Sequence, residues 1–482
     1  MTANEDPLAL VPELIMLAGA VTALLAGSFL GRTRQWVTQI LAALTLVATM
    51  LAGVLSATGP ARTVYGSSYA VDVATSAART IVPAAALLTI ALATRRVRGN
   101  ARESEFYVLV LLASLGAVVL AGASDLLLLA VGYLLASIPL YALAGWGRDS
   151  RGAEAALKLY LLGALLGIVM LLGASVLYGV GGGSTAYLAL AEGLPRAPAA
   201  AVAFGTVALL TGLLFKAGAV PAHFWVPDAV AGASVPAGAF LTTVPKIGGL
   251  IAMYRLLVVI PDSLVNWRLL VAVIAAASMT LGNFAAFGQR EPKRLLAYST
   301  ISQVGYLLMA VTVAGLSPDA LPALLLYLGG YAVTNLGAFA VVATLPQLAT
   351  LEDYRGLVRA RPALAGVLLV CLLGLVGTPP TVVFVGKLSI FAATWRGGWA
   401  WLVLVAAVNT LASLYYYLRW LAPAFDLQPA GARLPAGSGR PPALVATASW
   451  VGVSAVVAGC LSLLLGLGAG WGLALSSGVL GR

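Results

Sequence analysis

The sequence predicts an all-α protein that crosses a membrane many times. Of its 482 residues only 9% are charged and 61% are hydrophobic, and its mean hydropathy is +0.98. A chain of this composition has too few charged residues to cover a surface that faces water. A helix needs roughly 20 mostly apolar residues to cross the core of a bilayer, and apolar runs of this length follow one another along the chain.

The apolar runs predict about fourteen transmembrane helices, with ends defined to within a few residues. The first seven cover residues 8–30, 36–58, 73–94, 106–123, 125–146, 154–178 and 200–218. The second seven cover residues 237–259, 267–288, 294–315, 320–345, 363–394, 399–422 and 442–475. The 363–394 run is long and contains Pro379 and Pro380, which predict a break. The last run is rich in glycine, so its end is the least defined.

The first residues of the chain do not predict a cleaved leader, and its two cysteines do not predict a redox site. The first residues, MTANEDP, contain no basic segment and no cleavage site, so the first span is expected to stay in the mature protein. Cys371 and Cys460 both fall within predicted spans, without CxxC or histidine-rich spacing. This pattern favours small core residues over a disulfide or a metal site.

The basic residues indicate topology. The loops after odd-numbered spans carry about seventeen lysines and arginines, and the other loops carry about five. By the positive-inside rule, the former loops lie in the cytoplasm and both termini on the outer face, which agrees with an even number of spans. The net charge of +11 is spread over short loops and does not form a stripe or tail, so nucleic acid is not an expected partner.

The lysines stand out because the loops use arginine almost exclusively. Only five of the 28 basic residues are lysines. Four of them fall within predicted spans, at Lys158, Lys216, Lys246 and Lys387, and Lys293 lies just outside one. A guanidinium stays protonated, whereas an ammonium in a medium of low dielectric can release its proton. Charges in membrane spans are costly and indicate an ion path or a proton relay. The alternative is that these lysines snorkel or form structural pairs.

Two spans that carry these lysines are predicted to be broken. Pro221 and Pro227 follow Lys216 in span seven, and Pro379 with Pro380 precedes Lys387 in span twelve. Broken backbone is tolerated at membrane depth where protein or a water-filled cavity satisfies its polar groups. Because the breaks are five spans apart, spans 4–8 and 9–13 are predicted to form two five-helix repeats of inverted orientation.

Several stretches together resemble one family. They are EAALKLYLLGA (154–164), LLFKAGAVPAHFWVPD (213–228), AFLTTVPKIGGLIAMYRLL (239–257), KRLLAYSTISQVGYLL (293–308), YAVTNLGAFAVV (331–342), EDYRGL (352–357), GTPPTVVFVGK (377–387) and NTLASLYYYLR (409–419). From about Glu105 to Arg419 the chain resembles subunit N of the bacterial NADH-quinone oxidoreductase, complex I. The stretch KRLLAYST is shared with Mrp-type cation/proton antiporters and membrane-bound hydrogenases, so a subunit of one of these is the alternative.

The resemblance implies a proton channel driven by quinone reduction elsewhere in a larger complex. In this role, Lys216 is the central proton carrier, Lys246 relays the proton across the midplane, and Lys387 passes it to the exit. The division it implies is an N-terminal part, an antiporter-like core, and a loop with the last span, at residues 1–104, 105–425 and 426–482.

The resemblance also implies the partners of the chain and its location in the cell. The other membrane subunits of complex I, its quinone-reducing arm and the lipid bilayer are the expected partners, in a bacterial cell membrane. NADH and a quinone are used by the whole complex. We expect no cofactor or metal on this chain, because it contains no nucleotide-binding glycine motif and no metal-ligand cluster.

Other polar residues have two interpretations each. His223, after the break, is either a histidine satisfied within the fold or part of a water path. Glu154 and Lys158, four residues apart on one helix face, form either an uptake relay or a local ion pair. Hydroxyls and an amide in the tenth span either support a water wire or hold helices together, at Tyr298, Ser299, Ser302 and Gln303.

The chain departs from the family pattern at two positions. The family has a glutamate in span five where this sequence has Leu134, and usually another where it has Ala231. Without the first carboxylate, nothing nearby in the sequence offsets the burial of Lys216. Three hypotheses follow. The first is a divergent subunit of complex I, or a paralogue of it, in which proton transfer is altered, weakened or lost. The second is a fully active subunit that uses water, the remaining lysines or a carboxylate brought near by folding, and the third is a stand-alone, hydrogenase-associated or Mrp-associated ion antiporter or transporter.

Overall fold

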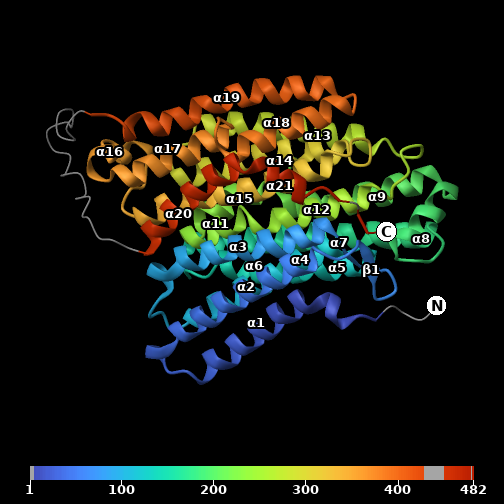
Figure 1. The fold of residues 1–482 in the computed structure, drawn as a ribbon, viewed down its shortest axis with the longest axis horizontal. Coiled ribbons are helices and arrows are strands. Elements are labelled where there is room, and N and C mark those ends of the chain that lie inside the picture. The colour runs from blue at the N-terminus through green and yellow to red at the C-terminus, as the bar shows by residue number, and fades with distance from the viewer. Residues whose placement is uncertain (1–4, 428–449, 479, 482) are drawn as a thin grey trace.

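The computed structural model describes residues 5–427, 450–478 and 480–481, and these form an almost entirely helical bundle. Figure 1 shows the long helices lying side by side, from α1 (Val11–Phe29) at one edge to α19 (Ala400–Ala424) at the opposite edge. Residues 428–449 lie outside the described part, so the predicted loop from residue 426 and the predicted start of the last span at residue 442 are not covered, nor are residues 1–4.

The first half of the chain contains most of the short elements. Its helices after α1 are α2 (Trp36–Ser56), α3 (Val73–Val97), α4 (Glu103–Gly122), α5 (Leu126–Leu135), α6 (Ile138–Ala144), α7 (Ser150–Val180), α8 (Tyr187–Gly193), α9 (Ala199–Ala217), α10 (Trp225–Gly232), α11 (Val235–Leu241) and α12 (Val244–Leu257). Strands β1 (Arg62–Val64) and β2 (Tyr69–Val71) form an antiparallel hairpin between α2 and α3.

The second half contains the remaining helices. These are α13 (Trp267–Phe287), α14 (Pro292–Thr312), α15 (Ala320–Thr344), α16 (Leu357–Ala360), α17 (Pro362–Val376), α18 (Val382–Arg396), α20 (Trp450–Leu467) and α21 (Ala469–Leu475), with α19 between α18 and α20. Among the described residues, 13 helices or helix pairs are long and apolar enough to cross a membrane. The α17–α18 pair covers the remaining predicted span, and its halves of 15 residues each are too short for that count.

Both predicted breaks are present. Helix α9 ends at Ala217 and α17 ends at Val376, and each is followed by a glycine in the left-handed conformation, Gly218 (φ 77°) and Gly377 (φ 94°). Glycine adopts this conformation without the steric cost that a Cβ atom brings, which is why it ends helices so often. The polypeptide then turns before α10 and α18 begin.

Two further breaks were not predicted. Span five is divided into α5 and α6, and span eight into α11 and α12, with Pro139 and Pro245 in the first turn of the second helix of each pair. A proline is tolerated at this position because the first turn needs no backbone donor. Each proline was therefore a signal of a helix start within a long apolar run.

Both described ends of the chain lie beside the hairpin. Arg62 of β1 forms a salt bridge of 2.8 Å with Asp6. The backbone N–H of Gly481 donates a hydrogen bond of 2.8 Å to Asp72, the residue that caps α3. The beginning and end of the described chain are thus at the same end of the bundle, at the right in Figure 1.

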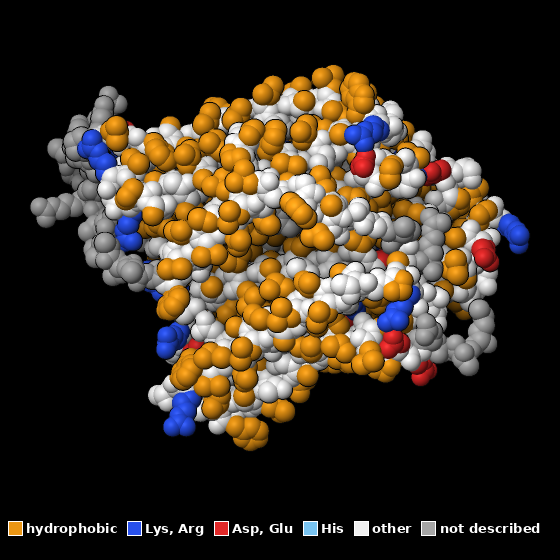
Figure 2. All heavy atoms as spheres, viewed as in Figure 1, with side chains coloured by type: hydrophobic (Ala, Val, Ile, Leu, Met, Phe, Trp, Pro, Cys, Tyr) orange, Lys and Arg blue, Asp and Glu red, His pale blue; other side chains and the backbone are white. Residues whose placement is uncertain are grey.

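The surface has a hydrophobic middle and charged ends. In Figure 2, hydrophobic side chains cover the middle of the visible face, and lysine, arginine, aspartate and glutamate lie toward its two ends. Lysine and arginine predominate at the end away from the hairpin, whereas both signs are mixed at the hairpin end. This distribution is the one expected of a bundle that spans a bilayer.

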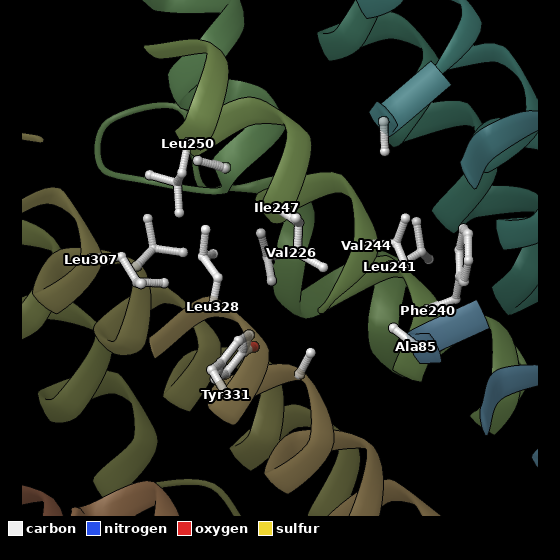
Figure 3. Close-up of a cluster of buried hydrophobic side chains, with 14 of the residues drawn as sticks. Ala85, Val226, Phe240, Leu241, Val244, Ile247, Leu250, Leu307, Leu328 and Tyr331 are labelled. Carbon is white, nitrogen blue, oxygen red and sulfur yellow. The ribbon is translucent and has the colours of Figure 1, made fainter. Parts of the chain in front are cut away.

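The centre of the bundle is packed with apolar side chains around the α11–α12 break. Figure 3 shows Leu241 at the end of α11 beside Val244 at the start of α12, while Leu328 and Tyr331 from α15 lie together elsewhere in the cluster. All four side chains are nearly inaccessible to solvent. A polar group in this region therefore depends on protein partners.

Candidate functional site

Lys216 lies in the last turn of α9, with its side chain directed into the bundle. The residue is 2% exposed. Its ammonium donates a hydrogen bond to the hydroxyl of Ser137, at the α5–α6 break, and lies 4.6 Å from the centre of the Tyr133 ring. The Ser137 hydroxyl in turn donates to the Tyr133 carbonyl at 2.6 Å. The break in span five thus supplies neutral partners for the buried lysine.

Lys246 follows the α11–α12 break and is completely buried. Its ammonium donates to the carbonyl of Leu241 at 3.3 Å and lies 5.3 Å from the centre of the Trp225 ring. A Cβ atom on Gly218 would lie 3.6 Å from the same ammonium nitrogen. The backbone at the end of α9 is therefore adjacent to Lys246, and links it to the element that carries Lys216.

Lys387 lies in α18, after the second predicted break, and is 3% exposed. Its ammonium donates to the last carbonyls of α17, at 3.1 Å from Leu375 and 2.7 Å from Val376. Carbonyls at the C-terminal end of a helix have no partner within the helix and carry the negative end of its dipole, so they favour a cation. The Tyr306 ring lies 4.1 Å from the ammonium.

Hydrogen-bonded side chains extend along α14 from the α11–α12 break, next to Lys246, toward Lys387. The Tyr331 hydroxyl lies 2.8 Å from the Thr242 carbonyl and 2.9 Å from the Thr300 hydroxyl, and its single proton can be donated to either oxygen. Thr242 is in the α11–α12 break, next to the carbonyl that binds Lys246.

One turn further along α14, Gln303 continues this row. Its amide donates to the Leu375 carbonyl at 2.8 Å, and this carbonyl also accepts from Lys387. The hydroxyl of Tyr327 donates to the Gln303 side-chain oxygen. Hydroxyls and an amide therefore lie between the surroundings of Lys246 and those of Lys387.

None of the three lysines has a carboxylate partner in the described part of the chain. The ion pairs found there join other residues. The carboxylate that one hypothesis required to be brought close by folding is therefore not at ion-pair distance from Lys216. Backbone carbonyls, a hydroxyl and aromatic rings take its place.

The secondary candidates lie in different surroundings. Lys158 forms ion pairs with Glu154 at 2.7 Å and Asp228 at 2.9 Å, and its side chain is 46% exposed, so it does not belong to the buried set. His223 follows the α9 break and is 6% exposed, with its Nδ1 lacking a hydrogen-bond partner among the described residues.

The hydroxyls predicted in the tenth span are only partly used. Ser299 and Tyr417 share a hydrogen bond of 2.5 Å, which ties α14 to α19, while the Ser302 hydroxyl has no partner among the residues described. Tyr298 is partly buried at the edge of the core. Of the four predicted residues, Gln303 donates to the Leu375 carbonyl, which also accepts from Lys387.

Leu134 and Ala231, the two positions that lack the family carboxylates, lie in different surroundings. The Leu134 side chain is 45% exposed on the outside of the chain, and Ser137, three residues later, is the residue that contacts Lys216. At Ala231 the backbone carbonyl accepts a hydrogen bond of 2.5 Å from Lys293.

Sequence reasoning missed Ser137 and Tyr133, which contact Lys216, and Thr300 and Tyr331, which are hydrogen-bonded near the α11–α12 break. Ser137, Tyr133 and Tyr331 each have apolar neighbours, whereas Thr300 lies in the polar stretch YSTIS (298–302). Polar residues within spans also join helices without any further role. Pro139, directly after the Ser137 break, was the available signal for span five.

A second set of buried charges lies near the hairpin end. Arg79 of α3 donates two hydrogen bonds of 2.7 Å to the Glu13 carboxylate, which also accepts from the Tyr69 hydroxyl at 2.5 Å. Arg255, at the end of α12, binds Asp72 at 2.7 and 2.9 Å. Burial alone would raise the pKa of Asp72, but the adjacent guanidinium lowers it below its ordinary value. These are complete ion pairs.

The chain was compared with protein families and with sequences of known proteins. The family described as NADH:quinone oxidoreductase/Mrp antiporter, TM, matches residues 123–413. The chain is 54% identical to NADH-quinone oxidoreductase subunit N 1 of Streptomyces griseus, over 98% of both chains. It is 53% identical to NADH-quinone oxidoreductase subunit N of a Mycobacterium species, over 96% of this chain and 97% of the relative.

Solved structures show the same fold. A chain of respiratory complex I from Thermus thermophilus with bound aureothin is 34% identical, with a TM-score of 0.81, over 97% of this chain and all of the other. A chain of the Mrp complex from Dietzia is 22% identical with a TM-score of 0.84, over 98% and 97% of the two chains, and at this identity the likeness concerns the fold alone.

Proposed function

Because the chain belongs to the subunit N family of NADH-quinone oxidoreductases, we propose that it conducts protons through a bacterial cell membrane as part of complex I. Other membrane subunits and the quinone-reducing arm are its proposed partners, and NADH and quinone react there rather than on this chain. The proposed core is residues 105–425, flanked by 1–104 and 426–482, with both termini on the outer face.

The observation that carries this proposal is the series of three buried lysines with neutral partners. Each of Lys216, Lys246 and Lys387 lies beside a helix break, where free carbonyls or a hydroxyl hold its ammonium. A lysine held by neutral groups is able to give up its proton without leaving an unpaired carboxylate in the core. The hydrogen-bonded groups on α14 and α15 provide a route between the second lysine and the third.

Proton transfer through Lys216 is proposed to be weaker than in a subunit with a carboxylate partner. Ser137 binds the ammonium, but a neutral hydroxyl stabilises the charged form less than an ion pair does. The driving force available from forming and breaking an ion pair at this lysine is therefore absent.

Substitution of Lys216 by methionine and by arginine tests the relay. Methionine removes the proton carrier, and arginine keeps a charge that stays protonated. If the lysine must release its proton, both variants lower the number of protons moved per electron pair by the intact complex in sealed vesicles. An unchanged proton yield in the arginine variant would show that only the positive charge matters, and would contradict the relay.

Assembly is tested by purifying the tagged protein from its own membranes in mild detergent. Mass spectrometry is expected to identify the other complex I membrane subunits and the quinone-reducing arm. Recovery of Mrp or hydrogenase subunits instead would contradict the proposed partners.

A further inference from the structure

A cavity of about 420 Å³ opens at the end of the bundle away from the hairpin. It is formed where α3 ends, where α7 and α14 begin, and beside the loop between α10 and α11. Its charged lining residues are Arg95, Arg96, Asp149, Arg151 and Lys293. None of the three relay lysines lines it.

The charges in the cavity are strongly unbalanced. Four cationic side chains face one carboxylate, and the Asp149 carboxylate already accepts a hydrogen bond of 2.8 Å from the Gly152 backbone at the start of α7. None of the lining arginines forms an ion pair with any described residue. A cluster of guanidinium groups without carboxylate partners attracts an anion.

Lys293 and Ser234 provide fixed donors at the wall. The Lys293 ammonium donates to the carbonyls of Ala231 and Ala233, at 2.5 and 3.1 Å, which holds it in place. Because an ammonium carries three protons, one remains for a ligand. The buried hydroxyl of Ser234 has no hydrogen-bond partner in the described chain, so it is available to a ligand oxygen.

Several other lining residues are apolar and belong to helices long enough to cross the membrane. These are Leu92, Val235, Pro236 and Ala343, with Pro346 just beyond α15. A ligand that fits this cavity therefore has an anionic oxygen-rich group next to an apolar part, at the level where the spans end. Basic pockets between transmembrane helices recognise the phosphate of anionic lipids in this way.

We propose that this cavity binds the phosphate group of an anionic phospholipid. The phosphate oxygens accept from Arg95, Arg96 and Arg151 and from Lys293, and the glycerol end of the acyl chains lies on the apolar wall. Soluble phosphate has the same chemistry without an apolar part, so it is the alternative source that the test must separate.

The alanine at position 231 favours this ligand. A glutamate there would place a carboxylate in the lining beside Lys293, reducing the excess of positive charge and competing for the ammonium. The Ala231→Glu substitution therefore removes the site while keeping all three arginines, which separates loss of binding from loss of the arginines themselves.

The test uses the intact complex, purified in detergent and depleted of lipid. Binding is measured with phosphatidylglycerol, phosphatidylcholine and inorganic phosphate, from the lipid retained by mass spectrometry and the shift in thermal unfolding. The variants are a triple substitution Arg95→Gln, Arg96→Gln and Arg151→Gln, and Ala231→Glu. The matched control is Arg32→Gln with Arg34→Gln, two exposed arginines outside the cavity.

We expect phosphatidylglycerol to bind the original protein and the control equally. The triple variant should lose affinity by on the order of a hundredfold, the product of roughly fivefold for each basic side chain at a membrane surface. Ala231→Glu should weaken binding in the same direction. A shift with inorganic phosphate as large as that with phosphatidylglycerol would assign the site to a soluble anion. Equal binding of phosphatidylcholine, or unchanged binding by both variants, would overturn the proposal.

Discussion

Two groups of buried cations in this molecule have opposite kinds of partners. The relay lysines contact carbonyls, one hydroxyl and aromatic rings, whereas Arg79 and Arg255 near the hairpin are paired with carboxylates. Helix α12 carries a member of each group. Lys246 at its start and Arg255 near its end are nine residues apart in number, about 13.5 Å along the helix axis.

The two kinds of partner distinguish cations that stay protonated in ion pairs from cations that can release their proton. A guanidinium stays protonated, and a carboxylate beside it completes an ion pair whose members each need the other. An ammonium held by neutral groups has no such dependence. We infer that the arginine pairs fix the hairpin end of α1, α3 and α12, while the lysines beside the helix breaks are left free to change protonation.

Removing a carboxylate from the arginine pairs gives the largest expected effect. Asp72→Asn leaves Arg255 buried without a counter-charge, which costs roughly 3–5 kcal/mol. Asparagine is also a good helix cap, so the loss reports the charge rather than the cap of α3. The thermal unfolding temperature of the purified complex is expected to fall.

The control for this prediction is Asp262→Asn. Asp262 pairs with Arg268 at 2.8 Å, but its side chain is 49% exposed, and surface pairs contribute about 0–1 kcal/mol. Equal destabilisation by the two substitutions would show that the buried pair near the hairpin has no special structural role.

Local sequence patterns account for most of this fold. Apolar runs placed each predicted span on a helix or a helix pair, and the prolines after Lys216 and before Lys387 placed two breaks. The breaks at Ser137 and Thr242 were missed, because a proline in a long apolar run starts a new helix as readily as it bends one.

The partners of the lysines were less accessible to sequence reasoning. Tyr331 binds the carbonyl of Thr242, 89 residues away, and Arg79 binds Glu13, 66 residues away. Hydropathy identifies which residues are buried but not which of them meet. Likewise, alignment by family motif directed attention to Leu134, while the contact with Lys216 is made by Ser137.

A carboxylate beside Lys216 would give this lysine the same kind of partner that Arg79 and Arg255 have. Ser137→Asp places the charge at the position that now contacts Lys216, and a hydrogen bond to a charged group contributes about 1.5–3 kcal/mol. If the missing ion pair weakens this subunit, the proton yield per electron pair rises.

Ser137→Asn is the neutral control, of nearly the same size as the aspartate, and is expected to leave the yield unchanged. The two variants are compared by the same vesicle measurement of protons moved per electron pair. An unchanged or lower yield in Ser137→Asp would favour a channel that already works fully with neutral partners.

The smallest expected effect is that of Leu134→Glu, which restores the family carboxylate at its own position. The Leu134 side chain is 45% exposed on the outside of α5, in the middle of a candidate membrane span, where a charged side chain is costly. The proton yield should therefore rise less than with Ser137→Asp, in the same vesicle assay and with Leu134→Gln as the uncharged control.

A rise as large as that of Ser137→Asp would show that residue 134 reaches Lys216 in the assembled complex, where a neighbouring subunit covers this face and turns a surface charge into a buried one. In that case the distinction between held and mobile charges would be set by the assembly rather than by this chain alone.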